Sequence, residues 1–321
     1  MPYEVLGIGA PNLDHILKVS SDFLKTLPGP KEGMQYINYE DVWELIQSTH
    51  KVEISVAGGS ACNTLKGLAH LGRHCALIGS IGSDPVAKII KKNLQDNYVN
   101  PLLIETQTPT GHVVCLVGPD GRRTFRTYVG AGRDLSAKDL EARHFHNIRL
   151  VHIEGYSLHN GPDLVETAMR MAKTAGARVS FDLSSFEIVE RHKPAIKNLL
   201  HNYVDVLFAN EHEIRALTGR KSDEAVRQLS HPGKVVVALM GQQGCWVSGN
   251  SEVHCYPAYP KEPVDTTGAG DLFASGFLHG YLSEKPLETC AHYGAVLGAA
   301  VVLEHGAEIP LSRWEAIRKQ L

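Results

Sequence analysis

The sequence has few features of a membrane or nucleic-acid-binding protein. Its apolar runs are too short to span a bilayer, and Gly294–Leu303 is among the longest. A formal net charge of -3 at pH 7 leaves no broad basic surface for nucleic acid. The first residues, Met1–Val5, lack the basic segment and apolar stretch of a secretory signal. We therefore expect a cytoplasmic protein that binds neither membranes nor nucleic acid.

The cysteines and histidines show no spacing typical of a disulfide framework or a metal site. None of the 6 cysteines forms a C-x-x-C pair, and most lie in apolar segments, which favours free, buried thiols in a reducing compartment. Among the 17 histidines, the group at His144, His146, His152 and His159 matches no common zinc pattern. Surface or hydrogen-bonded histidines are the simpler interpretation.

Three motifs of nucleotide and hydrolase chemistry are also missing. The sequence contains no G-x-x-x-x-G-K-[ST] phosphate loop and no G-x-S-x-G nucleophile motif. Gly7-Ile8-Gly9 is followed by Pro11 and Asn12, where a dinucleotide site needs a helix and a third glycine. These absences argue against a P-loop enzyme, a serine hydrolase of that fold and a dinucleotide-dependent oxidoreductase.

The order of the predicted elements indicates an α/β protein. A chain of 321 residues with 43% apolar residues can bury a large core. Strands and helices alternate regularly after a predicted helix at Ser136–Phe145, which favours a mostly parallel central sheet with helices on both faces. We expect one domain over residues 1–321, with a small β lid from about 15–56 and 101–130. The lid includes the β segments Leu102–Glu105, His112–Val117 and Thr124–Val129.

A glycine turn near the C-terminus is bracketed by two carboxylates. The segment Asp265-Thr266-Thr267-Gly268-Ala269-Gly270-Asp271 opens directly into an apolar-periodic helix. Such a helix start offers unpaired backbone N–H groups and a positive dipole end, and small residues let an anion approach them. Asp271 lies beside that anion, where a carboxylate is unfavourable unless it serves as a base.

Two earlier segments place small and polar residues near the ends of predicted elements. Asn12 and Asp14 follow the strand Tyr3–Gly9, at the edge where open α/β sheets bind ligands, although a structural turn accounts for them as well. Gly58 and Gly59 precede a helix that carries Asn63 one turn in. They allow close approach of a ligand to the backbone, unless they serve only helix packing.

The segment Asn210-Glu211-His212-Glu213 directly follows a predicted strand, Val204–Ala209. Asn210 can simply cap the next helix. Alternatively, Asn210 and Glu213 face phosphates and Mg²⁺, since Mg²⁺ prefers oxygen ligands and retains waters. Glu154 also ends a predicted strand, so several polar side chains gather at one edge of the sheet.

Taken together, these motifs resemble those of the PfkB/ribokinase family of carbohydrate and nucleoside kinases. Asp265–Asp271 is similar to its C-terminal signature, and Gly58-Gly59 with Asn63 to its N-terminal one. Asn210-x-x-Glu213 resembles the N-x-x-E motif of the family, and Asn12-x-Asp14 its sugar-binding strand end. The motifs follow the family order from Tyr3 to about Pro310. The resemblance implies the ribokinase-like three-layer fold.

The resemblance also implies a role for each matched residue. Asp271 would be the general base, and the N–H groups of Gly268, Ala269 and Gly270 would hold the charge of the transferred phosphoryl group. The substrate would contact Asn12, Asp14, Gly58, Gly59, Asn63 and Glu154. ATP would contact Asn210, Gly241, Gly244 and Thr266, with Mg²⁺ near Glu213 and Asp265. Many members also bind a monovalent cation such as K⁺ near Asp265 and the Glu304–Glu308 loop.

The substrate is less sharply defined than the reaction. Gly58–Thr64 and Ile153–Tyr156 are most similar to the bacterial adenosine kinase branch, whereas Asp14–Leu17 and Glu154 are similar to ribokinase. We expect transfer of the γ-phosphate of ATP to the 5′-hydroxyl of a nucleoside, with adenosine favoured and ribose or another furanose as the alternative. A catalytically silent binding protein is a third interpretation, opposed by the complete set of motifs. A homodimer is compatible with the sequence.

Overall fold

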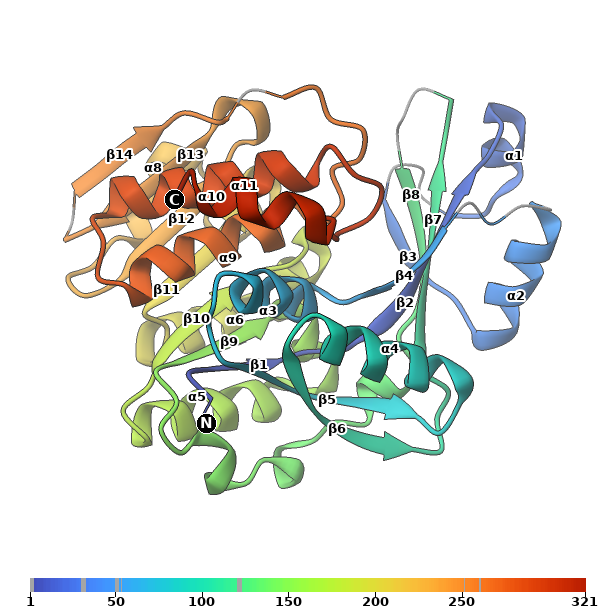
Figure 1. The fold of residues 1–321 in the computed structure, drawn as a ribbon, viewed down its shortest axis with the longest axis horizontal. Helices are drawn as coiled ribbons and strands as arrows, with labels where there is room; N and C mark the ends of the chain where they lie inside the picture. Colours follow the sequence, from blue (N-terminus) through green and yellow to red (C-terminus); the bar gives the residue numbers. More distant parts are fainter. Residues whose placement is uncertain are drawn as a thin grey trace.

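Two sheets organise the chain in the computed structural model, which describes residues 3–29, 33–49, 52, 54–119, 123–250, 252–259 and 261–321 (Figure 1). The larger sheet has nine strands, and all neighbouring pairs are parallel except those that β13 makes with β12 and β14. In spatial order its strands are β14 (Glu252–Tyr256), β13 (Cys245–Gly249), β12 (Val235–Leu239), β11 (Val206–Asn210), β10 (Arg178–Asp182), β9 (Leu150–Glu154), β1 (Val5–Ile8), β5 (Cys75–Gly82) and β6 (Val99–Thr106).

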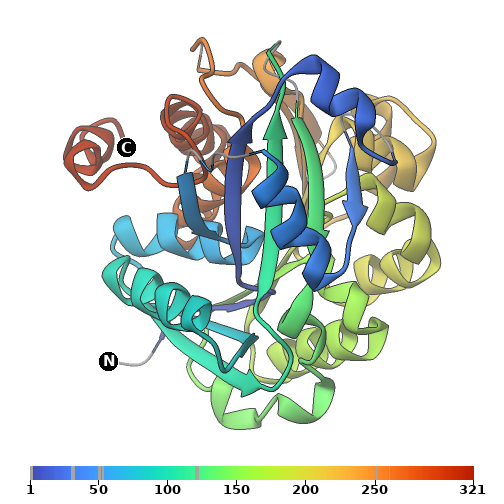
Figure 2. The ribbon, with the colours of Figure 1, turned by 90° about the vertical axis from the view of Figure 1, so that its right-hand side faces the viewer.

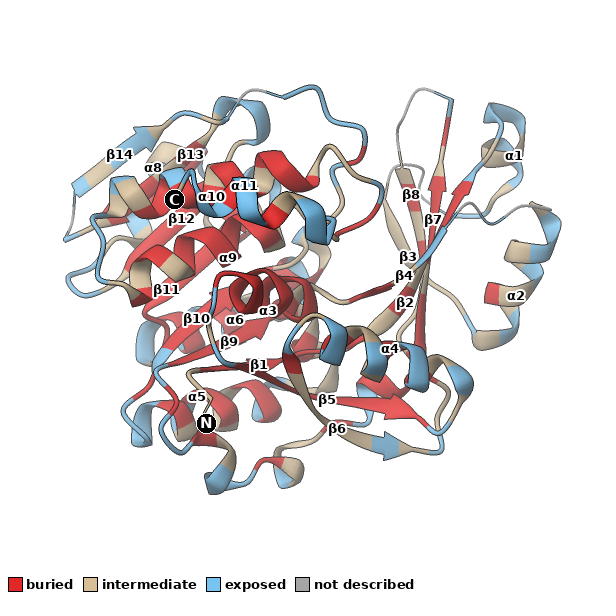
Figure 3. Cartoon of the chain, viewed as in Figure 1, coloured by how far each residue is buried: buried red, intermediate tan, exposed pale blue. Residues whose placement is uncertain are grey.

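Helices cover both faces of this sheet, as the strand–helix alternation predicts. One apolar core lies under α5 (Pro162–Thr174), α6 (Phe186–Asn202), α7 (Glu211–Thr218) and α8 (Ser222–Leu229). The other lies under α3 (Ser60–His70), α4 (Pro85–Asp96), α9 (Ala269–Leu282) and α10 (Leu287–Val301), with α11 (Trp314–Arg318) packed outside α10. Burial is concentrated along the central strands and in α3 and α9 (Figure 3). The predicted three-layer α/β fold is confirmed.

The smaller sheet lies beside the edge of the large one, where the sequence predicts a lid, and we keep that name for it. Its strands, in spatial order, are β3 (Met34–Tyr36), β8 (Arg123–Tyr128), β7 (Gly111–Val117), β2 (Asn12–Lys18) and β4 (Ile54–Gly58). Figure 2 shows α1 (Ser21–Thr26) and α2 (Tyr39–Ser48) on the outer side of these strands. A small core that includes Leu17, Val42 and Val114 joins these helices to the sheet. The opposite side of the small sheet, which these two helices do not cover, faces the large sheet.

Two expectations about local structure were wrong. The segment 102–105 belongs to β6, which pairs with β5 in the large sheet, because α4 joins the two strands in a parallel β–α–β unit. Residues 136–145 form two 3₁₀ turns, Ala137–Asp139 and Ala142–Phe145, instead of one helix. Asp139 accepts the Ser136 N–H at 2.8 Å and closes the first turn, after which Leu140 is extended and buried in the core.

The strand order creates a crevice at the carboxyl end of β1. From β1 the chain enters the lid, returns to β5 on one side of β1, and later forms β9 on the other side. Ligands of open α/β sheets bind where connections leave in opposite directions in this way. The carboxyl ends of β9, β10 and β11 lie along the same edge, because these strands run parallel. Among the described residues, no helix has the length and apolar character needed to cross a membrane.

Candidate active site

The glycine turn at residues 268–270 begins helix α9 at this edge. Gly268 is the residue before the helix, in the left-handed region with φ 73°. A Cβ at Gly268 would lie 2.4 Å from the Cβ of Ala307, so the turn needs glycine for both its conformation and its packing. Asp271 lies in the first turn of α9, as the sequence predicts. The unpaired N–H groups of the helix start therefore lie next to a carboxylate.

Two side chains from α3 hold the carboxylate of Asp271. The Ser60 hydroxyl donates to Oδ1 at 2.8 Å, and the Asn63 amide donates to Oδ2 at 2.9 Å. The two helices approach closely at Gly67, where a Cβ would lie 2.4 Å from Ser275 Oγ. The orientation of Asp271 is thus fixed by the N-terminal motif. Asn63 was predicted at the site, whereas Ser60 was not, although it stands next to Gly59.

The environment of Asp271 places its titration near neutral pH. Burial raises the pKa of Asp271 to about 6, against the hydrogen bonds from Asn63 and Ser60 and the positive charge of Lys66. At neutral pH most of this carboxyl group is ionised, and it accepts protons more readily than an ordinary aspartate. Those are the properties of a general base.

A cavity of about 350 Å³ lies over Asp271, between the lid and the large sheet; we call it the lid cavity. Asn12 and Asp14 line it from the start of β2, so the turn interpretation of these residues was wrong. Gly58 pairs with Asn12, and a Cβ at Gly58 would lie 2.2 Å from Asp14 Oδ2. Among the described residues, Asn12 and Asn63 each have a buried Oδ1 without a hydrogen-bond partner. The two asparagines that line the cavity thus each have an oxygen free to accept a hydrogen bond from a ligand.

The part of the lid cavity under β3 and β8 is lined by aromatic side chains that the sequence analysis did not assign to the site. Tyr36 from β3 meets His159 edge-on, with ring centroids 4.9 Å apart, and its hydroxyl is hydrogen-bonded to His159 Nε2. Phe125 from β8 and Tyr156 after β9 also line this region. No motif joins these residues, because they come from separate strands and short turns of the chain. Only the fold brings them together.

A second cavity, of about 960 Å³, lies on the other side of the glycine turn; we call it the outer cavity. Gly241 and Gly244 line it, as does Thr266, all three predicted to contact a nucleotide. The two cavities share lining residues at their meeting point, namely Asn210, Leu239, Thr266, Ala269 and Gly270. Two ligands, one bound in each cavity, would therefore meet at the start of α9.

Glu154 holds the backbone around the lid cavity. It is 1% exposed, and its two oxygens accept the N–H groups of Ala10 and Ala61, each at 2.7 Å. Burial raises the pKa of Glu154 to about 7, against these two hydrogen bonds. The carboxylate thereby joins the end of β1 to the beginning of α3. It also lines the cavity, and its contact with a substrate stays a prediction.

Asn210 and Glu213 form a capping box at the start of α7. Asn210 Oδ1 accepts the N–H of Glu213 at 3.0 Å, and Glu213 Oε2 accepts the N–H of Asn210 at 2.8 Å. The helix-cap interpretation is confirmed, and both residues also line the lid cavity. Within the described part of the chain, no three His, Cys, Asp or Glu residues are grouped to hold a metal ion. A magnesium ion here would take most of its ligands from phosphates and water.

Asp265 is bound to the lid by an arginine that the sequence analysis missed. Its Oδ1 accepts the Thr267 N–H at 2.6 Å and its Oδ2 the Gly306 N–H at 3.0 Å. The Arg123 guanidinium, at the start of β8, forms an ion pair with Oδ1 and donates to the Thr267 hydroxyl at 2.5 Å. Both oxygens of Asp265 are occupied and its charge is matched. Contact of Asp265 with a metal ion stays a prediction, and such an ion would share the carboxylate with these three partners.

A family model described as pfkB family carbohydrate kinase matches residues 37–314. The chain belongs to the PfkB family. It is therefore a kinase, a phosphotransferase with an alcohol group as acceptor. This membership also implies the use of ATP.

Known PfkB proteins resemble the chain over most of its length. The crystal structure of adenosine kinase from Sinorhizobium meliloti matches with a TM-score of 0.92 and 29% identity over 99% of each chain. An uncharacterized sugar kinase from Archaeoglobus fulgidus is 29% identical over 77% of this chain and 98% of its own length. Fructokinase-1 of Oryza sativa is 28% identical over 79% of this chain and 84% of its own length. Both sugar and nucleoside kinases are thus among the relatives.

Proposed function

We propose that the protein transfers the γ-phosphate of ATP to the 5′-hydroxyl of a nucleoside, with adenosine as the preferred acceptor. The observation that carries this proposal is the position of Asp271, a partly buried carboxylate that lines the lid cavity directly after Gly270, where the lid cavity meets the outer cavity. Two substrates bound in these cavities are held in line for transfer, which supplies much of the rate enhancement of phosphoryl transfer.

The residues around the glycine turn have complementary tasks in this proposal. Asp271 takes the proton of the attacking hydroxyl group. The N–H groups at residues 268–270, at the start of α9, stabilise the charge that develops on the phosphoryl oxygens. When bound, Mg²⁺ neutralises the phosphate charge, and Asn210 and Glu213 face that region. In the outer cavity, Gly241 and Gly244 contact the nucleotide and Thr266 lies beside its phosphates.

The acceptor occupies the lid cavity. Asp14 accepts hydrogen bonds from two neighbouring hydroxyl groups of a furanose, and the unpaired oxygens of Asn12 and Asn63 accept from others. The aromatic end of the cavity favours a planar heterocycle, because Tyr36, Phe125 and Tyr156 offer flat apolar surface. A nucleoside fills both parts. The likeness to a known adenosine kinase supports adenosine.

A furanose sugar is the second candidate. Asn12, Asp14 and Asn63 recognise hydroxyl groups whatever else the substrate carries, and sugar kinases are among the relatives. Free ribose or fructose, however, would leave the aromatic end of the lid cavity unfilled. The apolar surface there would stay in contact with water, at a cost of roughly 25 cal/mol per Å².

A substrate panel tests this proposal. Release of ADP from Mg·ATP would be measured with adenosine, inosine, guanosine, ribose and fructose in turn, with Asp271→Ala protein as the blank. We expect the highest kcat/KM with adenosine and little ATP hydrolysis without an acceptor. Turnover of ribose with none of any nucleoside would overturn the nucleoside assignment, and no turnover of any acceptor would favour a binding protein.

A further inference from the structure

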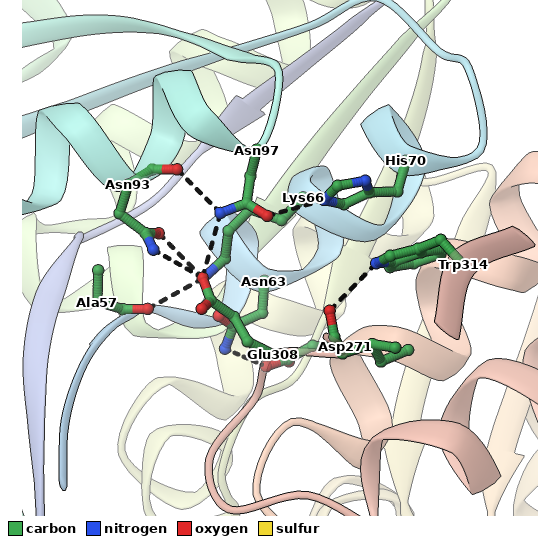
Figure 4. Close-up of polar contacts among 10 residues, drawn as sticks. Ala57, Asn63, Lys66, His70, Asn93, Asn97, Asp271, Glu308 and Trp314 are labelled. Atoms are coloured by element: carbon green, nitrogen blue, oxygen red, sulfur yellow. Dashed lines mark hydrogen bonds and ion pairs between the residues drawn. The ribbon is translucent and has the colours of Figure 1, made fainter. Parts of the chain in front are cut away.

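A buried lysine lies behind the candidate base and lines neither cavity. Lys66 is on α3, three residues after Asn63, and is 4% exposed. Its ammonium group donates to the Ala57 carbonyl at 3.0 Å and to Glu308 Oε1 at 2.9 Å (Figure 4). A buried charge persists only with such partners.

Glu308 is the partner that anchors Lys66. The same Oε1 also accepts the side-chain amides of Asn93 at 2.8 Å and Asn97 at 3.3 Å, both on or just after α4. Burial opposes ionisation of Glu308, but the Lys66 charge and these hydrogen bonds hold its pKa below the ordinary value. Glu308 is therefore ionised at neutral pH, and it forms an ion pair with Lys66. It joins α3, α4 and the segment that follows α10.

The segment that carries Glu308 supports the glycine turn from behind. Gly306 donates its N–H to Asp265 Oδ2 at 3.0 Å, and Ala307 packs against Gly268. The next residue after Glu308, Ile309, accepts a hydrogen bond from Trp314 Nε1 at 3.2 Å. A displacement of Glu308 would therefore also displace Gly306 and Ala307, which contact the glycine turn.

We propose that Lys66 is a positioning residue for phosphoryl transfer, which ties the turn of α3 that orients Asp271 to the Glu308 segment that supports the glycine turn. This inference rests on the proposed role of Asp271 as the base. One side chain then fixes both halves of the transfer site. Lys66 would thereby fix the position of the carboxylate that takes the proton relative to the N–H groups that bind the phosphoryl group.

Lys66 also places a positive charge behind a set of buried carboxylates. The acidic groups that act on Asp271 or respond to it come from four elements: Asp14 on β2, Glu154 on β9, Asp182 on β10 and Glu213 on α7. The charge of Asp271 raises the pKa of each of these four groups, whereas the Lys66 charge favours ionised Asp14 and Asp271. Loss of Lys66 should therefore move the titration of Asp271 to higher pH.

Four variants and one control test the inference: Lys66→Met, Lys66→Arg, Glu308→Gln, Lys66→Met/Glu308→Leu, and Lys92→Met. We expect Lys66→Met to lower kcat about tenfold or more with a KM for the acceptor within about threefold, as for a group that acts in the transition state. The acidic limb of its kcat–pH profile should shift upward by about half a unit or more. Lys66→Arg keeps the positive charge, so the acidic limb of its kcat–pH profile should coincide with that of the wild type.

The remaining variants separate positioning from simple stability. Glu308→Gln should lower kcat without an upward shift of the limb, because Lys66 keeps its charge. The double variant should regain thermal stability relative to Lys66→Met, since it leaves no buried unpaired charge, but should keep the shifted limb. Lys92 forms an exposed pair with Asp96 on α4, so Lys92→Met should behave as wild type.

Two results would overturn the inference. One is a Lys66→Met profile that superimposes on the wild type, with kcat recovered together with stability in the double variant. The other is an unchanged kcat in Glu308→Gln, which also decides the question if Lys66→Met does not fold. Normal turnover in Asp271→Asn would instead refute the proposed base, whatever the Lys66 variants do.

Discussion

The side-chain amide of Asn63 donates to Asp271 Oδ2 over 2.9 Å and so joins two residues 208 positions apart in the chain. Gly67 makes this contact attainable, because it lets α3 lie directly against Ser275 of α9. The N-terminal and C-terminal motifs of the sequence thereby build a single site. The proposed base depends on that contact for its orientation.

The pH dependence of the reaction should report the titration of Asp271. Burial raises its pKa to about 6, and a base must be ionised to accept a proton. We therefore predict that kcat is constant above about pH 7 and falls about tenfold per unit as the pH drops below 6. Initial rates with saturating substrates between pH 5 and 9 check this. A profile that stays flat down to pH 5 would contradict it.

Arg123 should couple the lid to the glycine turn. Its guanidinium pairs with Asp265 and bonds to the Thr267 hydroxyl, so Arg123→Met removes the described side-chain link between β8 and that turn. We predict a loss of about 10- to 100-fold in kcat and faster hydrogen exchange in β7 and β8.

Arg143→Met serves as the matched control for Arg123. Arg143 is exposed, lies outside the lid in the 3₁₀ turn Ala142–Phe145, and pairs only with the nearby Glu141 among the described residues. Its replacement should leave kcat and exchange unchanged. Equal effects of the two substitutions, or a normal kcat in Arg123→Met, would show that the lid is not held through Arg123.

Tyr36 should distinguish nucleosides from free sugars. Its ring lines the lid cavity beside His159, on β3, which β8 and β7 separate from the strand of Asp14, and we expect the base to lie there. Tyr36→Ala is predicted to raise the KM for adenosine about tenfold, the loss of about 1.4 kcal/mol of contact. Residual activity on ribose, measured in the same assay, should change less than twofold. Equal losses on both acceptors would refute a base-binding role.

Gly268 should tolerate no side chain. Gly268→Ala forces a left-handed conformation, at about 1–2 kcal/mol, and adds a clash with Ala307. Gly176→Ala, with φ 80° and open space around the site, carries the conformational cost alone. Urea unfolding should therefore show the larger loss of stability for Gly268→Ala, together with a strong loss of kcat. Equal stabilities would show that the packing against Ala307 does not matter.

The parts of the fold that could be read from the sequence are those with strong local patterns. The buried parallel strands are short apolar runs, and the start of α9 carries its own glycine signal at Gly268. The placement of β6 and the two 3₁₀ turns before Phe145 depended on strand pairing and core packing, which local periodicity does not encode. The same limit applied to the site.

Most residues within recognisable motifs line the lid cavity or the outer cavity, including Asp14, Asn63 and Gly244, whereas Gly58 and Asp265 line neither. Arg123, Tyr36 and Lys66 were missed, because each acts through partners distant in the chain. Asp265 was expected to lie near a metal ion, which stays a prediction, and its pairing with Arg123 was missed. The motif gives the place of Asp265 in the glycine turn, whereas its pairing with Arg123 depends on how the lid lies over the large sheet.

The central claim is that Asp271 is the base that activates a nucleoside hydroxyl. The most direct test compares kcat for adenosine and the Kd of adenosine, by calorimetry, in wild-type and Asp271→Asn protein. Asparagine keeps the shape of the side chain but cannot take the proton, so we predict a fall in kcat of about 1,000-fold with Kd within about threefold. A variant that turns over normally, or one that fails to bind adenosine, would contradict the account.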